Sequence, residues 1–396
     1  MLKHDEADLV AEKYLNMQLE AKDRPGDLTV TLAILIIIAA LAAAFWIIPD
    51  RASSEEENRV LAQFPEFSPE SLESGKFTSD FASYMADQFP MRDTFVGIKA
   101  AAEISMLKLE NNSVMLAPGD TLAERFDTVN TDNVKANTDA INAFCGTLNS
   151  RGVTARFALL PRSMDIFDIP VYGRGASERE WQSVRDIAGD GMIDMRSVFD
   201  AHSGEYIYYR TDHHYTTLGA YYTYAALGDS LGYTPNSVEH YKRTEASDSF
   251  FGTTYSKSGM KWISPDTVEY FRWDGDDKLT VTVAETGEVR DGLYFEEYLS
   301  SKDKYASFAG GNFARIDIAR PGEVREKLLI VKDSFAHALV PFLAEHFDIT
   351  MIDTRYYKRP VIKLAEDEGF SRVLVLCNLD TLSSAKPFEI LRMGLK

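Results

Sequence analysis

The sequence predicts an α/β domain in which helices flank a parallel sheet, preceded by one membrane-spanning helix. Two observations carry this prediction. From about residue 100 onward, apolar runs of strand length alternate with longer runs of helical spacing. Near the N-terminus, 21 consecutive residues from Leu28 to Ile48 carry no charge. The chain of 396 residues is 45% hydrophobic and 26% charged, so it can bury a substantial core.

The apolar segment 28–48 is predicted to be a retained transmembrane helix. At about 1.5 Å per residue it crosses a hydrocarbon layer of about 30 Å. A cleaved signal peptide normally has a shorter apolar region nearer the N-terminus, and no small-residue cleavage site follows Ile48. A weak excess of Lys and Arg before the segment predicts a cytoplasmic tail at residues 1–27 and a large extracytoplasmic domain after the span.

Residues 49–99 are predicted to form a stalk and an N-terminal helical segment. The stretch PDRASSEEENR is charged and is expected to be flexible. After it, Pro65, Pro69 and Pro90 divide a run of Phe, Tyr and Leu residues into short helices.

Residues 100–396 are predicted to form the α/β domain. A helix at 133–150 precedes a buried strand at 153–161 and a short strand at 191–195. Residues 240–320 show strand-like alternation with Gly and Asp turns, which predicts a β-rich insertion. Beyond it, the segments KLLIV, DITMID and RVLVL predict three further strands, the first of them followed by a helix.

Composition excludes several classes of function. A net charge of -19 argues against a nucleic-acid partner, since binding phosphate requires clustered Lys and Arg. The two cysteines, Cys145 and Cys377, are too few for a disulfide scaffold or a Cys-rich zinc site. We expect both to be buried, and we expect no cofactor.

A serine lies at a predicted strand-to-helix turn in LLIVKDSFAHAL. There the hydroxyl of Ser334 would be exposed at the carboxyl end of the strand, beside the N–H groups and positive dipole of the helix N-terminus. This arrangement suits a nucleophile, although the G-x-S-x-G pattern is absent. On this segment alone, helix capping by Asp333 or Ser334 explains the residues more simply.

The segment TDHHYTTLGAYYTY places an Asp and two His directly before a helix-like run. A nucleophilic serine needs a His to accept its proton and an acid to fix the tautomer of that His. Asp212 and either His213 or His214 supply both. The alternatives are polar side chains at a helix start, or a metal site completed by His337 or Asp333. No established metal-ligand spacing is present, so the metal site is the weaker functional alternative.

A third polar residue follows a predicted strand in VLVLCN. Asn378 would lie at the same sheet edge as Ser334, where its amide can donate to a tetrahedral oxyanion. An Asx turn is the commoner use of such an Asn. Taken together, the three segments place a nucleophile, a base, an orienting acid and an oxyanion donor at strand ends, where open α/β sheets bind ligands.

TDHHYTTLGAYYTY resembles the signature of the DHHW protein family, with Tyr215 in place of the Trp. ENRVLAQFPEF, YMADQFPMRD, VKDSFAHALVPFL and IDTRYY are also similar in type and order, so the resemblance extends from about residue 55 to the end of the sequence. DHHW proteins are similar to the alginate acetyltransferases AlgX and AlgJ. The resemblance therefore implies an SGNH-hydrolase-like sheet.

In those relatives an Asp-x-His pair precedes the catalytic Ser in the chain. The resemblance implies that Asp212 orients the base His214, that Ser334 is the nucleophile, and that His213 is only the intervening residue. By strand order, Asn378 corresponds to the SGNH oxyanion Asn, with the N–H of Ser334 as a second donor. The Gly of the second SGNH block has no counterpart here.

Further residues at strand ends and in loops are candidate contacts to a substrate: Arg162, Lys332, Tyr255, Lys257, Asn312 and Arg355. Turn chemistry or solvation explains each of them singly.

The resemblance implies transfer of an acyl group, acetyl in the relatives, to a cell-surface polysaccharide outside the membrane. It further implies that a polytopic membrane acyltransferase supplies the acyl group. An acetyl esterase, a non-catalytic polysaccharide-binding scaffold, and a metal-dependent hydrolase that uses Asp212, His213 and His214 are the alternatives.

Overall fold

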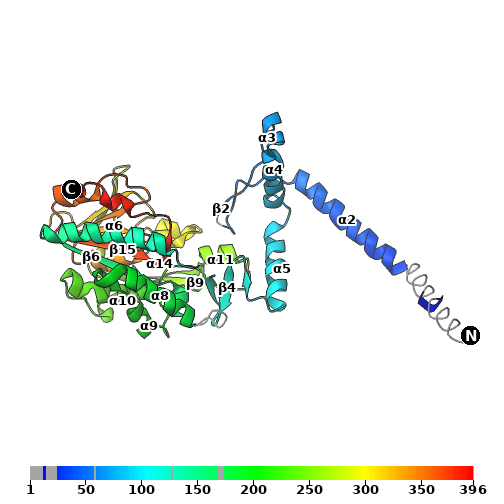
Figure 1. Cartoon of the computed structure of the whole chain (residues 1–396). Coiled ribbons are helices and arrows are strands. Elements are labelled where there is room, and N and C mark those ends of the chain that lie inside the picture. Colours follow the sequence, from blue (N-terminus) through cyan, green and yellow to red (C-terminus); the bar gives the residue numbers. More distant parts are fainter. Residues whose placement is uncertain (1–11, 15–24, 58, 126–127, 168–173, 396) are drawn as a thin grey trace, which may run out of the picture. The chain divides into compact units, whose positions relative to one another are not determined.

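The computed structural model describes residues 12–14, 25–57, 59–125, 128–167 and 174–395 (Figure 1). The chain forms two compact units, residues 1–96 and 97–396. Most of the predicted tail, residues 1–27, lies outside the described residues.

The first unit contains one long apolar helix, α2 (Pro25–Ile47). Its segment Leu28–Ile47 has a mean hydropathy of 2.8, and almost all of its side chains are exposed. By length and composition, α2 can therefore cross a membrane, as predicted for residues 28–48.

After α2 come the paired strands β1 (Ser53–Ser54) and β2 (Arg59–Val60), and the helices α3 (Pro69–Glu73) and α4 (Lys76–Asp87). Arg59 donates to both carboxylate oxygens of Asp87, at 2.8 and 2.5 Å. Mainly through these bonds, Arg59 lowers the pKa of Asp87 to about 2. The end of the predicted stalk is thus tied to α4. Helix α5 (Arg92–Ser105) continues into the second unit.

The second unit is built on an eight-stranded sheet with the order β11-β10-β12-β14-β13-β15-β6-β7. Strands β14, β13, β15, β6 and β7 are parallel, as predicted, whereas β12, β10 and β11 continue the sheet antiparallel. In chain order these strands are β6 (Thr154–Leu160), β7 (Met192–Asp194), β10 (Thr280–Val283), β11 (Glu288–Asp291), β12 (Arg315–Ala319), β13 (Lys327–Lys332), β14 (Asp348–Asp353) and β15 (Arg372–Asn378).

The β-rich insertion predicted at 240–320 contributes to two sheets. Its strands β8 (Lys242–Phe250) and β9 (Asp266–Arg272) form a separate ribbon, while β10, β11 and β12 extend the main sheet. In β10, Val281 and Val283 are buried and alternate with half-buried Thr, the pattern of a strand with one face in the core. A third small sheet comprises β3 (Glu110–Asn111), β4 (Val114–Ala117) and β5 (Thr121–Glu124).

Helices cover both faces of the main sheet, which is the reason why β13 is apolar throughout its middle. On β13, Leu328 and Ile330 belong to one hydrophobic cluster, and Leu329 and Val331 to a second cluster that includes Trp181. In chain order, the α-helices after α5 are α6 (Thr131–Ser150), α7 (Ser163–Ile166), α8 (Arg174–Ala188), α9 (Arg196–Ala201), α10 (Thr217–Leu231), α11 (Thr253–Ser258), α12 (Ala336–Leu343), α13 (Val361–Asp367) and α14 (Leu379–Ser383), of which α11 packs on the small sheet of β4 and β5.

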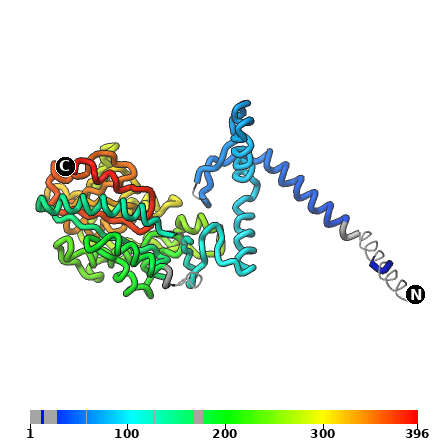
Figure 2. Tube along the Cα trace, viewed as in Figure 1, coloured from blue at the N-terminus to red at the C-terminus, as the bar shows by residue number. Residues whose placement is uncertain are grey.

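The C-terminal segment returns to the long helix α6, as Figure 2 shows in red and teal. The Asn137 amide on α6 donates to the carbonyl of Leu382 at 2.8 Å, and its oxygen accepts from the N–H of Phe388. These bonds fix α14, which directly follows β15, and the segment after α14. Because β13 and β15 are parallel neighbours, the turn after β13 lies beside the start of α14.

Candidate active site

Ser334 lies in the turn between β13 and α12, and its side chain is partly exposed. In this turn, Asp333 makes the hydrogen bond expected of a helix cap: its Oδ1 accepts from the N–H of Phe335 at 3.0 Å. Asp333 Oδ2 accepts from the N–H of Asn378 and from Thr381 Oγ1, at 2.8 and 2.9 Å. Asp333 therefore joins the ends of β13 and β15 and leaves the Ser334 hydroxyl without a capping role.

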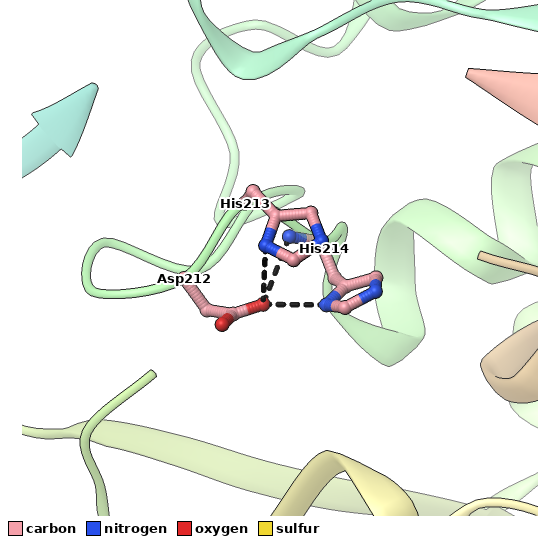
Figure 3. Close-up of side chains that lie close together, drawn as sticks. All are labelled: Asp212, His213 and His214. Carbon is pink, nitrogen blue, oxygen red and sulfur yellow. Dashed lines mark hydrogen bonds and ion pairs between the residues drawn. The ribbon is translucent and has the colours of Figure 1, made fainter. Parts of the chain in front are cut away.

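The Ser334 hydroxyl contacts a histidine from a loop 120 residues earlier in the chain. His214 Nε2 lies 2.7 Å from Ser334 Oγ, and His214 Nδ1 lies 2.5 Å from Asp212 Oδ1. Figure 3 shows this carboxylate oxygen directed toward both histidines. With Nδ1–H donated to Asp212, Nε2 is the basic nitrogen and can accept the Ser334 proton.

The Asp212 carboxylate is held by four hydrogen bonds. Oδ1 also accepts from the N–H of His214 at 3.0 Å, and Oδ2 accepts from the N–H and the hydroxyl of Thr253, at 2.8 and 3.0 Å. Gly252 permits this approach, because a Cβ at that position would lie 2.2 Å from the Asp212 Cβ. The insertion thereby fixes the orientation of the acid.

Protonation in the site follows from burial and from neighbouring charges. Burial, together with the charge of His213, lowers the pKa of His214 to about 4, and the opposing effect of Asp212 is smaller. Burial raises the pKa of Asp212, but the charges of the two histidines and the bonds from His214 and Thr253 outweigh it and hold this pKa far below its usual value. At neutral pH the pair is a carboxylate beside a neutral imidazole.

This protonation state predicts the pH dependence of an activity that needs His214 as a base. Because only neutral His214 accepts a proton, kcat/KM should fall with decreasing pH as His214 becomes protonated, near pH 4 rather than at the ordinary histidine value. The measurement is kcat/KM for an uncharged acetyl ester between pH 3 and 9. In His213→Ala the acid limb should move to higher pH, since a repulsive charge is lost. An acid limb at or above the ordinary histidine pKa in the unaltered chain would contradict this assignment.

Tyr305, in the 3₁₀ turn Lys304–Ser307, packs against both the base and the nucleophile's turn. Its ring stacks on the His214 ring at a centroid distance of 3.9 Å and an interplanar angle of 11°. Its hydroxyl donates to the carbonyls of Ser334 and Phe335, at 3.3 and 3.4 Å. The His213 ring also lies 3.9 Å from the His214 ring but is tilted by 37°. Of these two rings, only that of Tyr305 stacks on the imidazole.

Tyr305 should therefore position His214. We expect Tyr305→Leu to lower kcat by about 10²-fold with little change in KM, because a displaced base no longer meets the Ser334 hydroxyl. Tyr305→Phe keeps the stacked ring and should retain most of the activity. Circular dichroism melts would show whether both variants are folded. Equal losses in both variants would assign the effect to the hydroxyl instead of the ring.

Two donors near Ser334 are available for an oxyanion. Asn378 Oδ1 accepts from the N–H of Thr381 at 3.0 Å, which caps α14 and fixes the orientation of the amide. Within the described part of the chain, neither Asn378 Nδ2 nor the Ser334 N–H donates a hydrogen bond. Both donors were expected from the sequence, and their role in catalysis stays a prediction.

A pocket of about 420 Å³ adjoins the site. Its lining includes His213, Thr253 and Asn378, which contact or flank the Ser334 machinery, and Arg162, one of the candidate substrate contacts. Several residues with hydroxyl groups also line it: Thr128, Ser163, Thr253, Ser383 and Ser384. These polar groups can form hydrogen bonds with a polyhydroxylated molecule.

The remaining candidate substrate contacts lie elsewhere. Lys332 is buried, with Nζ 2.6 Å from His337 Nε2 and 3.5 Å from Asp353, and it lines a second pocket together with Arg355. Arg355 donates to Asp353 and to Asn312 Oδ1. Tyr255 is buried against Phe251, and Lys257 forms an ion pair with Glu124.

Asp212, His213 and His214 bring one ligand atom each within 4.8 Å of one another, as the metal alternative requires. A metal ion at this position would compete with existing bonds. Asp212 Oδ1 already accepts from the His214 ring and N–H, and His213 Nδ1 lies 2.8 Å from the Thr253 hydroxyl. The geometry favours the hydrogen-bonded relay over metal ligation.

The comparisons with known proteins bear out the resemblance and the fold. A family model described as DHHW protein matches residues 187–352, and one described as the SGNH hydrolase-like domain of acetyltransferase AlgX matches residues 122–250. The first match contains Asp212, His214 and Ser334. No curated protein matches the chain.

Solved structures of the same fold include a DHHW family protein from Eubacterium siraeum, with 23% identity and a TM-score of 0.61, over 71% of this chain and 95% of that one. Bacillus cereus PatB1 with a sulfonyl adduct shows 20% identity and a TM-score of 0.58, over 71% of this chain and 99% of that one. A second PatB1 structure shows 19% identity and a TM-score of 0.57, over 69% and 98% of the two chains. The predicted α/β fold is confirmed.

Proposed function

We propose that this protein is a serine-dependent O-acyltransferase that moves acetyl groups onto hydroxyls of a cell-surface polysaccharide. The observation that carries the proposal is the continuous relay from Ser334 Oγ through the His214 ring to Asp212, with distances of 2.7 and 2.5 Å. Similarity to the AlgX acetyltransferase domain supports the acyl-transfer chemistry. PatB1 carries a sulfonyl adduct in one structure, and sulfonyl groups react with activated nucleophiles.

In the first half-reaction, Ser334 Oγ attacks the carbonyl carbon of the acetyl donor while His214 Nε2 takes the hydroxyl proton. The negative charge that develops on the carbonyl oxygen is stabilised by the Asn378 amide and the Ser334 N–H. When the tetrahedral intermediate collapses, the bond to the donor oxygen breaks and His214 returns the proton to that oxygen. The products are the free donor alcohol and an acetyl ester on Ser334.

In the second half-reaction, a sugar hydroxyl in the pocket beside His213 gives its proton to His214 and attacks the acetyl ester. Collapse of the second intermediate releases the acetylated sugar and returns the proton to Ser334 Oγ. Water in place of the sugar hydroxyl yields acetate, which is the esterase alternative. Asp212 stays ionised throughout and stabilises the protonated imidazole.

The location of the reaction is part of the proposal. Helix α2 anchors the chain in a membrane, and the second unit lies on the extracytoplasmic side, where the polysaccharide is found. The acetyl group must then be supplied on that side, for which we propose a polytopic acyltransferase in the same membrane.

The test uses the full chain in detergent, an acetyl ester as donor and an oligosaccharide as acceptor. We expect acetylated acceptor and acetate from the unaltered chain and neither from Ser334→Ala. Equal turnover by the two chains would defeat the serine mechanism, and no turnover by either chain would favour a non-catalytic scaffold. Activity that EDTA abolishes would favour the metal-dependent alternative, and acetate as the sole product with every acceptor would favour the esterase.

A further inference from the structure

The pocket beside the nucleophile contains two arginines, and neither is free to neutralise an anionic ligand. Arg162 has a side-chain exposure of only 9% and contacts three carboxylates, those of Asp165, Asp380 and Glu180, at 2.9, 3.5 and 3.9 Å. Arg125 pairs with Glu110 at 3.2 Å. The positive charge of the pocket is therefore already balanced by the protein.

The carboxylates of the pocket are more accessible than its buried arginine. Asp380 and Glu124 line the pocket, and their side chains are 63% and 43% exposed. Glu124 forms an ion pair with Lys257 at 2.6 Å. The lining thus presents two exposed carboxylates and one exposed cation, Arg125, which is paired with Glu110, while the guanidinium of Arg162 is buried.

The whole region around the pocket is also net negative. Among the residues that the structure describes, the pocket's charged groups and their ion-pair partners comprise three cations and five carboxylates: Arg125, Arg162, Lys257, Glu110, Glu124, Asp165, Glu180 and Asp380. The net charge of the full sequence is -19. A polymer with one carboxylate per sugar would be repelled on approach and inside the pocket.

We infer that the acceptor is a polysaccharide of uncharged sugars rather than a uronic-acid polymer, an inference that rests on the proposed function. The pocket offers such sugars hydroxyl groups from Thr128, Ser383 and Ser384. These groups hydrogen-bond sugar hydroxyls without requiring a counter-charge. The exposed carboxylates of Glu124 and Asp380 disfavour the polyanionic class.

The test measures binding, so that it does not depend on turnover. Ser334→Ala full chain is titrated by calorimetry at low salt with neutral tetrasaccharides of glucose, of mannose and of N-acetylglucosamine, and with tetragalacturonate. We expect at least one neutral tetrasaccharide to bind at least about tenfold more tightly than the uronate, with a smaller difference at high salt, where charge repulsion is screened. Uronate binding that equals or exceeds that of every neutral tetrasaccharide would overturn the inference, as would binding by none of the neutral ones.

Charge variants locate the effect. In the Ser334→Ala background, Glu124→Gln with Asp380→Asn should raise uronate affinity by about fivefold or more and change neutral binding by a smaller factor. Glu323→Gln, which removes an exposed carboxylate at the amino edge of the sheet, is the matched control and should change neither. An unchanged uronate affinity in the double variant would contradict the inference. If the binding results were as expected but the unaltered chain showed no turnover that depends on Ser334, only the proposed function would be defeated.

Discussion

Replacement of His214 by Ala should lower kcat/KM for an acetyl ester by about 10⁴-fold or more, because Ser334 loses the group that accepts its proton. The Ser334 hydroxyl has no other base within hydrogen-bonding distance in the described part of the chain, since its side-chain contact is to His214 Nε2 at 2.7 Å. A fluorophosphonate probe should label Ser334 in the unaltered chain and fail to label it in His214→Ala.

His213→Ala is the matched control, since it removes the adjacent imidazole from the same loop. The His213 side chain is 39% exposed and bonds the Thr253 hydroxyl, so its loss leaves the relay in place. We expect labelling and activity at neutral pH to persist. The opposite pattern, with activity lost in His213→Ala and kept in His214→Ala, would exclude the assignment of His214 as the base.

Asp212→Asn should cost about 10⁴-fold in kcat with a small change in KM. An amide can donate where the carboxylate accepts, so the His214 ring would hold the tautomer in which Nε2 carries the proton. That nitrogen then has no lone pair for the Ser334 hydroxyl. Stopped-flow measurement of the first turnover would place the loss in the acylation step.

Thr253→Val provides the comparison for Asp212→Asn, because it removes one of the hydrogen bonds to the carboxylate and keeps the carboxylate itself. Its loss of kcat should be less than about tenfold, the cost of one hydrogen bond. If Asp212→Asn and Thr253→Val lowered kcat equally, Asp212 would be a structural residue of the loop instead of the partner of the base.

The sequence predicted the parts of the site that lie at regular positions of the fold. Ser334 and Asn378 follow buried apolar strands, and parallel neighbouring strands bring their carboxyl ends together. The resemblance divided the two histidines into a base and an intervening residue. In the structure, His214 contacts Ser334, whereas His213 lines the pocket.

Contacts from the insertion were not predictable from spacing. Gly252, Thr253 and Tyr305 complete the surroundings of Asp212 and His214, but they lie about 40 to 90 residues later in the chain. Such contacts form between loops without a periodic pattern, so the sequence carries no local signal for them. The antiparallel extension of the sheet was not predicted, for a similar reason. The alternation in β10 indicates one buried face, but it does not indicate that β10 pairs with β12.

The most direct test of the central claim is whether Ser334 becomes acetylated. The full chain is mixed with an acetyl ester, quenched in acid within the first turnovers, and digested for peptide mapping by mass spectrometry. We predict one acetyl group on Ser334 in the unaltered chain and none on this residue in His214→Ala. An acetyl group on another residue, or steady turnover with Ser334 unmodified at every quench time, would contradict a serine mechanism.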